Sequence, residues 1–436
     1  MRRTALIVAL SLLAPFAAAE NLSDIYRLAL ANDPVYAAAR EAYRAGLERL
    51  PQARANLLPS LNLSAFARNT DTDVSSAPGS TSNQPYGYGI SLTQPIYRKQ
   101  NLETLAQARL IVTQAEQQLK LAEQQLLLRV AQAYFDVLLA EDNLTTAQAQ
   151  KQAFAEQLAQ ARRSFEVGAA TIVDSHEAQA RYDRAVADEI AAVNDLEVKR
   201  RALEKLINQS APRLAPLRDP VALPLPSPSG VDPWVQQAQE QSLGVLLSQS
   251  NREIARREVE RQRGGHYPSL DLTAGYSDSR RTSTIPGSGS SVNIKSGSIG
   301  LEFNLPLYQG GGTDSRVREA VANLERARFE LDNARREAAL QARQAYLDVV
   351  SGEARSKALE QALVSNEAQL KSTKLGLEVG VRTRVDVLNA EQQRYATLRD
   401  LYAERYRVLL AGLQLKAAAG ILTEGDLKGI DALLKP

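Results

Sequence analysis

The sequence predicts a mixed α+β fold that is written twice in one chain, with very long helices and four short strands. Two long stretches consist of helix-forming residues, and four short segments alternate apolar with polar residues. A set of motifs also returns in the same order after about 210 residues. The chain of 436 residues has no cysteine, which excludes disulfides and cysteine-based metal sites.

The first residues predict a signal peptide. Arg2 and Arg3 precede an uncharged stretch from Thr4 to Ala19 that ends in three alanines. Because secretory signals have this pattern, we expect residues 1–19 to be removed. Basic and acidic residues are then equal in number, which argues against nucleic acid as a partner. No later stretch reaches the roughly 18 consecutive apolar residues of a transmembrane helix, so none is expected.

Long helices are predicted by composition. Residues 96–167 contain neither Gly nor Pro and are dominated by Ala, Leu, Gln, Glu and Arg, which favour helix. We predict a long helix over 98–166 and, after a Val-Gly break, a helix over 170–208. The second half repeats this plan over 313–376 and 382–419. The helix over 98–166 would be roughly 100 Å long, which indicates a coiled-coil-like bundle or tube.

Four short segments are predicted as strands because apolar and polar residues alternate in them. These strands cover about 59–70, 86–97, 268–279 and 293–307. The segments between them, about 71–85 and 279–292, are rich in Ser, Thr, Gly and Pro and predict polar loops. Four strands cannot close a membrane barrel, since the smallest barrels have about eight. They would form a soluble sheet, or several chains would pool them.

The repeats divide the mature chain into four parts. The first repeat is predicted over 20–208 and the second over 236–420, with a connector at 209–235 and a C-terminal segment at 421–436. Seven prolines in the connector exclude a regular helix there. Prolines are also expected at the junctions of helices and strands, because a residue before proline is displaced from helical geometry. These junction prolines are Pro59, Pro95, Pro268 and Pro306.

With these features, nearly the whole mature chain resembles the TolC family of outer-membrane efflux proteins. The resemblance rests on the duplicated plan, the junction prolines, the segment Leu307–Gly311, both Val-Gly breaks and, most specifically, the segment Val379–Ala390. It implies a homotrimer in which each chain gives four strands to one twelve-stranded β-barrel in outer-membrane lipid. The long helices would form an α-helical barrel across the periplasm, with the connector and the C-terminal segment as a belt around it.

The resemblance also implies a function. The protein would be an exit duct for type I protein secretion, drug efflux or both, without catalysis or cofactor. It would dock with a periplasmic adaptor and an inner-membrane ABC or RND transporter that supplies the energy. One alternative stays open on the sequence, a periplasmic coiled-coil adaptor or scaffold without a pore. A secreted hydrolase is a second alternative with little support, since no nucleophile-His-acid set or metal-ligand spacing is present.

Site residues follow from the family motifs by position. Adaptor docking is implied at the two Val-Gly breaks, which comprise Val167, Gly168, Ala169, Val379, Gly380 and Val381. Arg382 and Asp174 match residues that hold the tip shut, and Asp386 matches an acidic ring at a cation-selective entrance. Asn389 stands where a second acidic ring is often found, and Leu377 where Tyr is common, so these two features depart from the family pattern. Each charged residue could instead lie on a solvated helix face.

Overall fold

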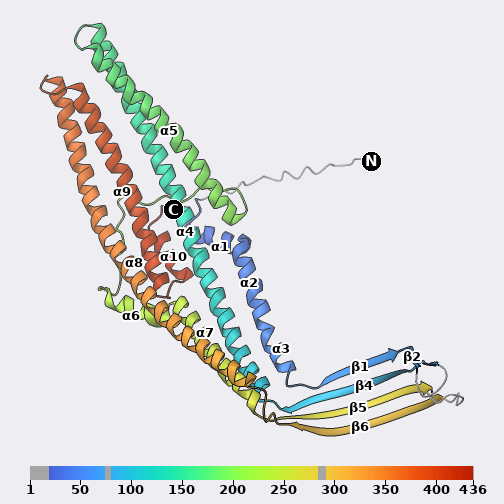
Figure 1. Cartoon of the computed structure of the whole chain (residues 1–436). Coiled ribbons are helices and arrows are strands. Elements are labelled where there is room, and N and C mark those ends of the chain that lie inside the picture. Colours follow the sequence, from blue (N-terminus) through green and yellow to red (C-terminus); the bar gives the residue numbers. More distant parts are fainter. Residues whose placement is uncertain (1–18, 74–79, 283–290, 436) are drawn as a thin grey trace, which may run out of the picture. The chain divides into compact units, whose positions relative to one another are not determined.

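The computed structural model describes residues 19–73, 80–282 and 291–435 (Figure 1). The chain divides into two compact units. The helical unit comprises Met1–Ala39, Lys120–Leu243 and Arg335–Pro436, and the strand unit comprises Arg40–Leu119 and Gly244–Ala334. Each unit combines segments from both halves of the sequence, so the two repeats are interleaved in space. The signal peptide predicted over 1–19 falls almost entirely outside the described residues.

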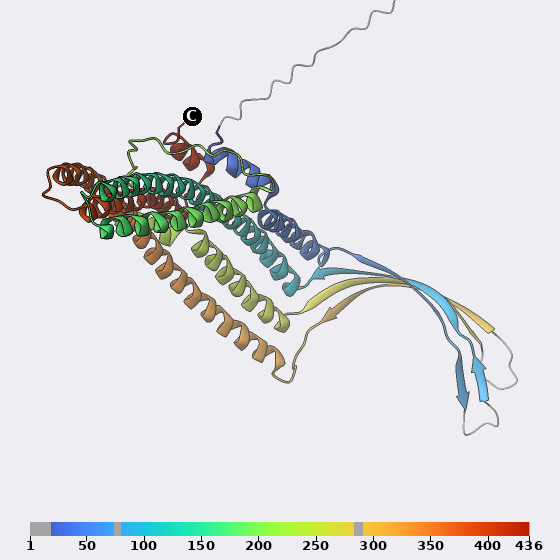
Figure 2. The same cartoon turned by 90° about the horizontal axis from the view of Figure 1, so that it is seen from above.

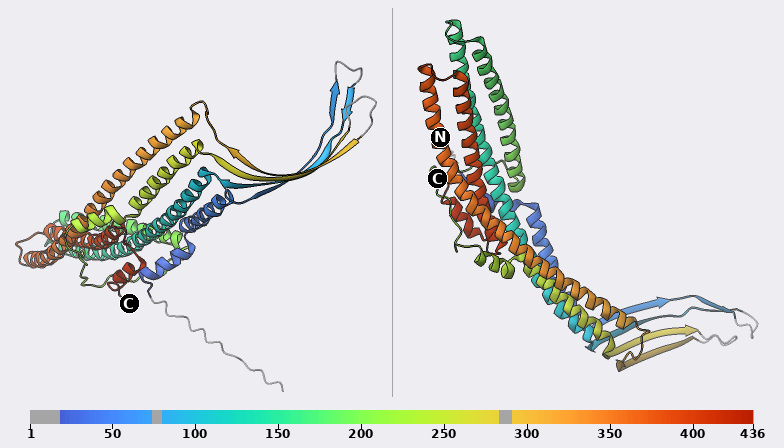
Figure 3. Two further views of the ribbon diagram at one scale, coloured as in Figure 1. Left: turned by 90° about the horizontal axis from the view of Figure 1, so that it is seen from below. Right: turned by 60° about the vertical axis from the view of Figure 1, so that its left-hand side comes forward.

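Two long hairpins form most of the helical unit. The first consists of α4 (Lys99–Glu166) and α5 (Ile172–Ile207), and the second of α8 (Gly312–Glu378) and α9 (Arg384–Ala418). These helices correspond to the four that composition predicts. Within the helical unit the two hairpin turns lie at the same end (Figure 1 and Figure 3).

The core of the helical unit lies where short segments cover the long helices. Here α1 (Leu22–Asn32) and α10 (Glu424–Asp431) bury apolar side chains against α4, α5 and α9. Tyr134 is fully buried in this core, and its hydroxyl donates to the Ala215 carbonyl at 2.9 Å. The connector and the C-terminal segment are joined by backbone hydrogen bonds, such as Arg218 N–H to the Leu433 carbonyl at 2.9 Å.

One boundary of the connector differs from the prediction. A helix, α6 (Asp232–Gln241), begins inside the predicted range 209–235. Pro233 lies in its first turn. Proline is well tolerated there, because the N–H that it lacks has no partner in a helix anyway. Proline density therefore excludes helix from most of the connector but not from its last residues.

The strand unit contains one antiparallel sheet of four strands in the order β1-β4-β5-β6. Figure 2 shows these strands side by side. They are β1 (Ser60–Ala67), β4 (Tyr86–Tyr97), β5 (Ser269–Thr282) and β6 (Ser291–Asn304). The central pair β4 and β5 joins the two halves of the sequence, with Ile90 opposite Tyr276. The short helices α2 (Pro34–Leu47) and α3 (Arg49–Ala55) precede β1.

The strands differ from the prediction at several ends. The predicted loop over 71–85 contains parts of β2 (Thr70–Asp73) and β3 (Ser80–Asn83), which pair with each other. The residues of β2 and β3 are all polar, so no apolar alternation marks these strands, although their backbone continues the hairpin. Similarly, β5 continues to Thr282, into the predicted loop over 279–292, whereas β6 ends at Asn304, short of the predicted 307.

The junction prolines also occupy unequal positions. Pro59 and Pro268 stand directly before β1 and β5, as expected. Pro95 instead lies inside β4, where the pairing with β5 becomes irregular. A proline has no N–H to give to a ladder, and strands accommodate it at such irregularities. Pro306 lies two residues beyond the end of β6. The predicted junction at Pro95 is therefore displaced toward the helix.

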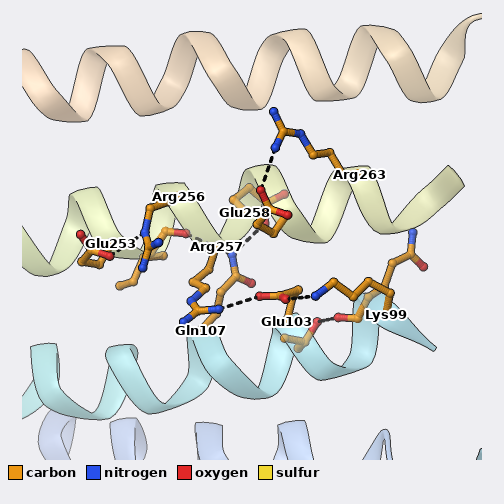
Figure 4. A network of polar contacts seen from close by, with 12 residues as sticks. Lys99, Glu103, Gln107, Glu253, Arg256, Arg257, Glu258 and Arg263 are labelled. Atoms are coloured by element: carbon orange, nitrogen blue, oxygen red, sulfur yellow. Dashed lines mark hydrogen bonds and ion pairs between the residues drawn. The ribbon is translucent and has the colours of Figure 1, made fainter. Parts of the chain in front are cut away.

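A polar network joins α4 to α7 (Leu243–Arg263) within the strand unit (Figure 4). Glu103 is buried and accepts from Lys99 at 2.5 Å, while Arg257 of α7 reaches its other oxygen at 3.3 Å. Glu258 accepts from Gln107 across the same pair of helices at 3.0 Å. Alanine-rich helices offer few large apolar contacts, so such charge-assisted bonds hold the helices in register.

Candidate functional site at the helical tips

The two hairpin turns are built around glycines with positive φ. Gly168 has φ 73° and Gly380 has φ 80°, a conformation that L side chains rarely adopt. Apart from the glycine and its two neighbours in the chain, no atom among the described residues lies within 4 Å of where a Cβ would stand on either residue. The backbone, rather than packing, therefore requires glycine here. Three valines beside them, Val167, Val379 and Val381, are each at least 66 % exposed. The turns thus present small apolar side chains and bare backbone to the surroundings.

A capping box starts the helix after each turn. Asp174 Oδ2 accepts from the Thr171 N–H at 3.0 Å, and Thr171 Oγ1 accepts from the Asp174 N–H at 3.3 Å. Thr383 and Asp386 repeat this arrangement at 2.9 and 3.3 Å. The N–H and hydroxyl of Thr383 hold the pKa of Asp386 below its ordinary value. Both predicted gate carboxylates therefore cap helices, a role that the Thr-x-x-Asp spacing could have indicated.

Arg382 lies at the second turn, just before α9. Its N–H donates to the Gly376 carbonyl at 3.1 Å. A Cβ on Gly376 would come within 2.7 Å of Arg382 Cγ, so the stem of the arginine occupies the space that this glycine leaves. Within the described part of the chain, no hydrogen bond or ion pair joins Arg382 to Asp174. The predicted link is not made inside one chain and stays a prediction.

Asn389 receives a charged partner that the sequence motifs do not predict. Arg181 of α5 donates from Nη2 to Asn389 Oδ1 at 3.1 Å and from Nη1 to Gln392 of α9. Its Nε donates to Glu177, one turn earlier on α5, at 3.1 Å. Sequence reasoning missed Arg181 because its partners on α9 are more than 200 residues away, and no local pattern marks the pairing.

Below the turns the two hairpins share a small apolar core. It includes Phe154 and Leu158 from α4 and Leu388 from α9. Arg384 is only 8 % exposed beside it and donates to Ser164 Oγ at 3.3 Å. Nη1 of Arg384 has no hydrogen-bond partner among the described residues. A buried arginine nitrogen without a partner is costly. This side chain is therefore a point where a further polar group would stabilise the tip.

The described residues contain neither a metal-binding cluster nor a membrane-crossing helix. Residues 19–73, 80–282 and 291–435 contain no cluster of three or more His, Asp or Glu side chains able to hold a metal ion. In that same part of the chain, no helix combines the length and the apolar character needed to cross a membrane.

Comparison with known proteins identifies the family. The family model described as outer membrane efflux protein matches residues 25–209 and again 234–421, in step with the two repeats. The outer membrane protein TolC of Vibrio cholerae is 33 % identical over 96 % of this chain and 94 % of its own length. The alkaline protease secretion protein AprF of Pseudomonas aeruginosa is 32 % identical over 97 % of this chain and 89 % of its own.

The fold agrees with solved structures. The outer membrane protein VceC of Vibrio cholerae superposes with a TM-score of 0.76 at 19 % identity, covering 92 % of this chain and 96 % of that one. CusC superposes with a TM-score of 0.80 at 16 % identity, covering 93 % of each chain. The mostly helical chain with one four-stranded sheet thus has the fold of these channels. The family match favours a channel over the scaffold without a pore that the sequence left open. The chain belongs to the outer membrane efflux protein family and is an outer-membrane channel of the secretion and efflux type, extending into the periplasm.

Proposed function

We propose that three copies of this chain pool their strands into one twelve-stranded barrel and their long helices into one tunnel, which serves as an exit duct. The observation that carries this proposal is the sheet order β1-β4-β5-β6. In the described residues, β1 and β6 each pair on one side only. An open edge cannot stand in lipid, and four strands are fewer than the roughly eight of the smallest barrels.

The outer face of the strands supports the same assembly. Leu61 and Leu63 alternate on β1, and Ile299, Leu301 and Phe303 alternate on β6; all five are largely exposed in a single chain. Apolar residues that recur with period two along two edge strands match the lipid-facing row of a barrel. Joining β1 of one chain to β6 of the next would cover both edges and leave this apolar row outside.

Disulfide trapping tests the closure. The natural chain has no cysteine, so only introduced cysteines can pair. Ser64→Cys on β1 would be combined with single cysteines placed along β6, and each single variant alone serves as the control. At the matching register we expect covalent bands up to the trimer and none beyond it. Monomers at every register, or a ladder that continues past the trimer, would contradict the closed assembly.

The hairpin turns are proposed as the docking surface for a periplasmic adaptor, which would connect the duct to an inner-membrane ABC or RND transporter. The exposed valines and bare glycines at the turns support this, because a partner helix can approach backbone closely where no side chain intervenes. The docking residues remain Val167, Gly168, Ala169, Val379, Gly380 and Val381.

Matched glycine substitutions separate docking from backbone strain. Gly168→Leu and Gly380→Leu should abolish or reduce export while the channel still conducts in planar bilayers. Gly310 also has positive φ, 60°, with open space around it, but lies before α8 in the strand unit. Gly310→Leu therefore imposes the same strain away from the turns and should leave export normal. Normal export by both turn variants would remove the turns as the docking surface.

We further propose that Arg382 of one chain meets Asp174 of a neighbouring chain and holds the tip closed. The hydrogen bonds of the Asp174 side chain all use Oδ2, which leaves Oδ1 free to accept. A guanidinium stays charged at every physiological pH, so a pH change in that range would not break the link. Arg382→Glu should raise the single-channel conductance, and Gly376→Ala, which displaces the arginine stem, should raise it less. Wild-type conductance in Arg382→Glu would place the gate elsewhere.

The cargo is proposed to include secreted proteins. AprF and another relative, the proteases secretion protein PrtF of Dickeya chrysanthemi, are named for protease secretion, and 30–32 % identity over nearly the whole chain supports the same use here. Drug efflux is the second candidate, favoured by the efflux family model. Expression in cells that lack their own channel distinguishes the two: restored protein secretion supports the first, and restored drug resistance alone supports the second.

A further inference from the structure

The guanidinium of Arg181 is fixed between two helices at the hairpin tips. Its Nη2 donates to Asn389 at 3.1 Å, its Nη1 donates to Gln392, and its Nε donates to Glu177 at 3.1 Å. Every nitrogen of the side chain is used, so the cation cannot swing away without breaking several bonds. The Arg181 side chain keeps 29 % of its surface exposed, so its charge acts on the adjoining solution.

Asn389 stands one helical turn after Asp386, on the same face of α9. This face therefore carries a carboxylate at its first level. At the next level it carries an amide that accepts a hydrogen bond from a cation of the neighbouring helix. An amide oxygen can hold a guanidinium but adds no negative charge. Arg181 also pairs with Glu177 at 3.1 Å, so its guanidinium offsets a carboxylate at this level and the second level adds no net negative charge to that of Asp386.

Two further arginines lie beside Arg181. Arg184 and Arg399 line a polar cavity of about 370 Å³ together with Arg181. Among the described residues, Asp188 is the one carboxylate on the walls of this cavity, and it pairs with Arg184 at 3.1 Å. Gln150, 5 % exposed, also lines the cavity, and its Oε1 has no partner in the described part of the chain. Arginine thus outnumbers carboxylate on the walls of the cavity.

We propose that Arg181 sets the charge preference of the channel entrance at the level of Asn389. It weakens the preference for cations that an acidic ring of Asp386 would give and lets small inorganic anions such as chloride enter. This inference rests on the proposed trimer, in which the hairpin tips surround the ion path. It requires only that the guanidinium lie within about one Debye length of that path, about 10 Å at 0.1 M salt.

Reversal potentials in a KCl gradient across planar bilayers test the proposal. Arg181→Gln removes three charges per trimer and should raise the permeability ratio of potassium to chloride about two- to fivefold, as expected for three charges near one Debye length. Arg181→Lys keeps the charge and should stay near wild type. Arg201→Gln removes the same charge from an exposed position on α5, about 30 Å further along the helix, and should leave the ratio unchanged.

A second pair of variants tests whether the net charge at this level sets the preference. Asn389→Asp alone adds one negative charge per chain beside Arg181 and should raise the ratio about as much as Arg181→Gln does. Combined with Arg181→Gln, the same substitution should give the most cation-selective channel of the set. Equal ratios in the wild type and Arg181→Gln would overturn the inference and leave the proposed channel intact. The absence of any channel conductance in the wild type would instead overturn the proposed trimeric duct.

Discussion

The capping box of Thr383 and Asp386 allows the effect of capping α9 to be separated from the effect of the negative charge of Asp386. Thr383→Ala removes the hydroxyl that accepts the Asp386 N–H at 3.3 Å and keeps the carboxylate. Asp386→Asn removes the charge, but the amide oxygen can still accept the Thr383 N–H, which the carboxylate now accepts at 2.9 Å. The two substitutions therefore alter one cap in complementary ways.

The expected size follows from the capping energy. Replacing an N-cap Thr with Ala costs roughly 1 kcal/mol. In the proposed trimer the change occurs three times, which gives roughly 3 kcal/mol if the three tips open together. If opening the tip unwinds this first turn of α9, so that the cap is made only in the closed state, each 1.4 kcal/mol is about a tenfold change and the closed-to-open ratio should fall about a hundredfold. Thr383→Ala channels should open more often at an unchanged ion preference, and their tips should be cleaved faster by protease.

Single-channel recording of both variants, with limited proteolysis, checks this expectation. Asp386→Asn should keep the wild-type open probability and lose part of its cation preference. Thr423→Ala is the matched control, because that hydroxyl bonds to Asp426 at 3.0 Å at the start of α10, away from the tips. Wild-type behaviour of Thr383→Ala together with an opened tip in Asp386→Asn would contradict this expectation, since the charge of the carboxylate and not the cap would then stabilise the closed tip.

Three further predictions concern pH and packing. The N–H and the hydroxyl of Thr383 lower the pKa of Asp386, so the cap stability and the cation preference expected from its charge are complete above the ordinary pKa and are lost only as pH falls through the lowered one. Thr383→Ala keeps the N–H and removes the hydroxyl, so reversal potentials against pH should show this midpoint move part of the way back up. Gly352→Ala places a Cβ 2.6 Å from a side-chain methyl of α9 and should destabilise the chain by about 1–3 kcal/mol. Gly412→Ala meets open space and should stabilise its helix by up to about 1 kcal/mol. A higher melting temperature for Gly352→Ala than for Gly412→Ala would contradict the close packing at Gly352. Glu103→Ala leaves Lys99 and Arg257 without their shared carboxylate partner and should lower the free energy of unfolding by about 1–3 kcal/mol, measured by denaturant unfolding. Glu103→Gln should lie between Glu103→Ala and wild type. Equal stability of all three proteins would show that the network contributes nothing.

The sequence by itself determined the elements that depend on local preferences. Helix-forming composition placed α4 and α8, period-two alternation placed the ladder strands, and the Val-Gly breaks placed the turns at Gly168 and Gly380. These features are set by residues within a few positions of each other, so one sequence suffices to find them. The order of the motifs likewise indicated the duplication, and the family model matches the two halves separately.

The tertiary structure decided everything that joins distant residues. It paired β4 with β5 across the two halves and interleaved the repeats in both compact units. It also placed Pro95 inside a strand and brought Arg181 to Asn389 from another helix. No periodicity or motif encodes such contacts, because they form only when helices and strands from different parts of the chain pack together. The charge at the second level of the tip therefore depends on a residue that the motif around Asn389 does not contain.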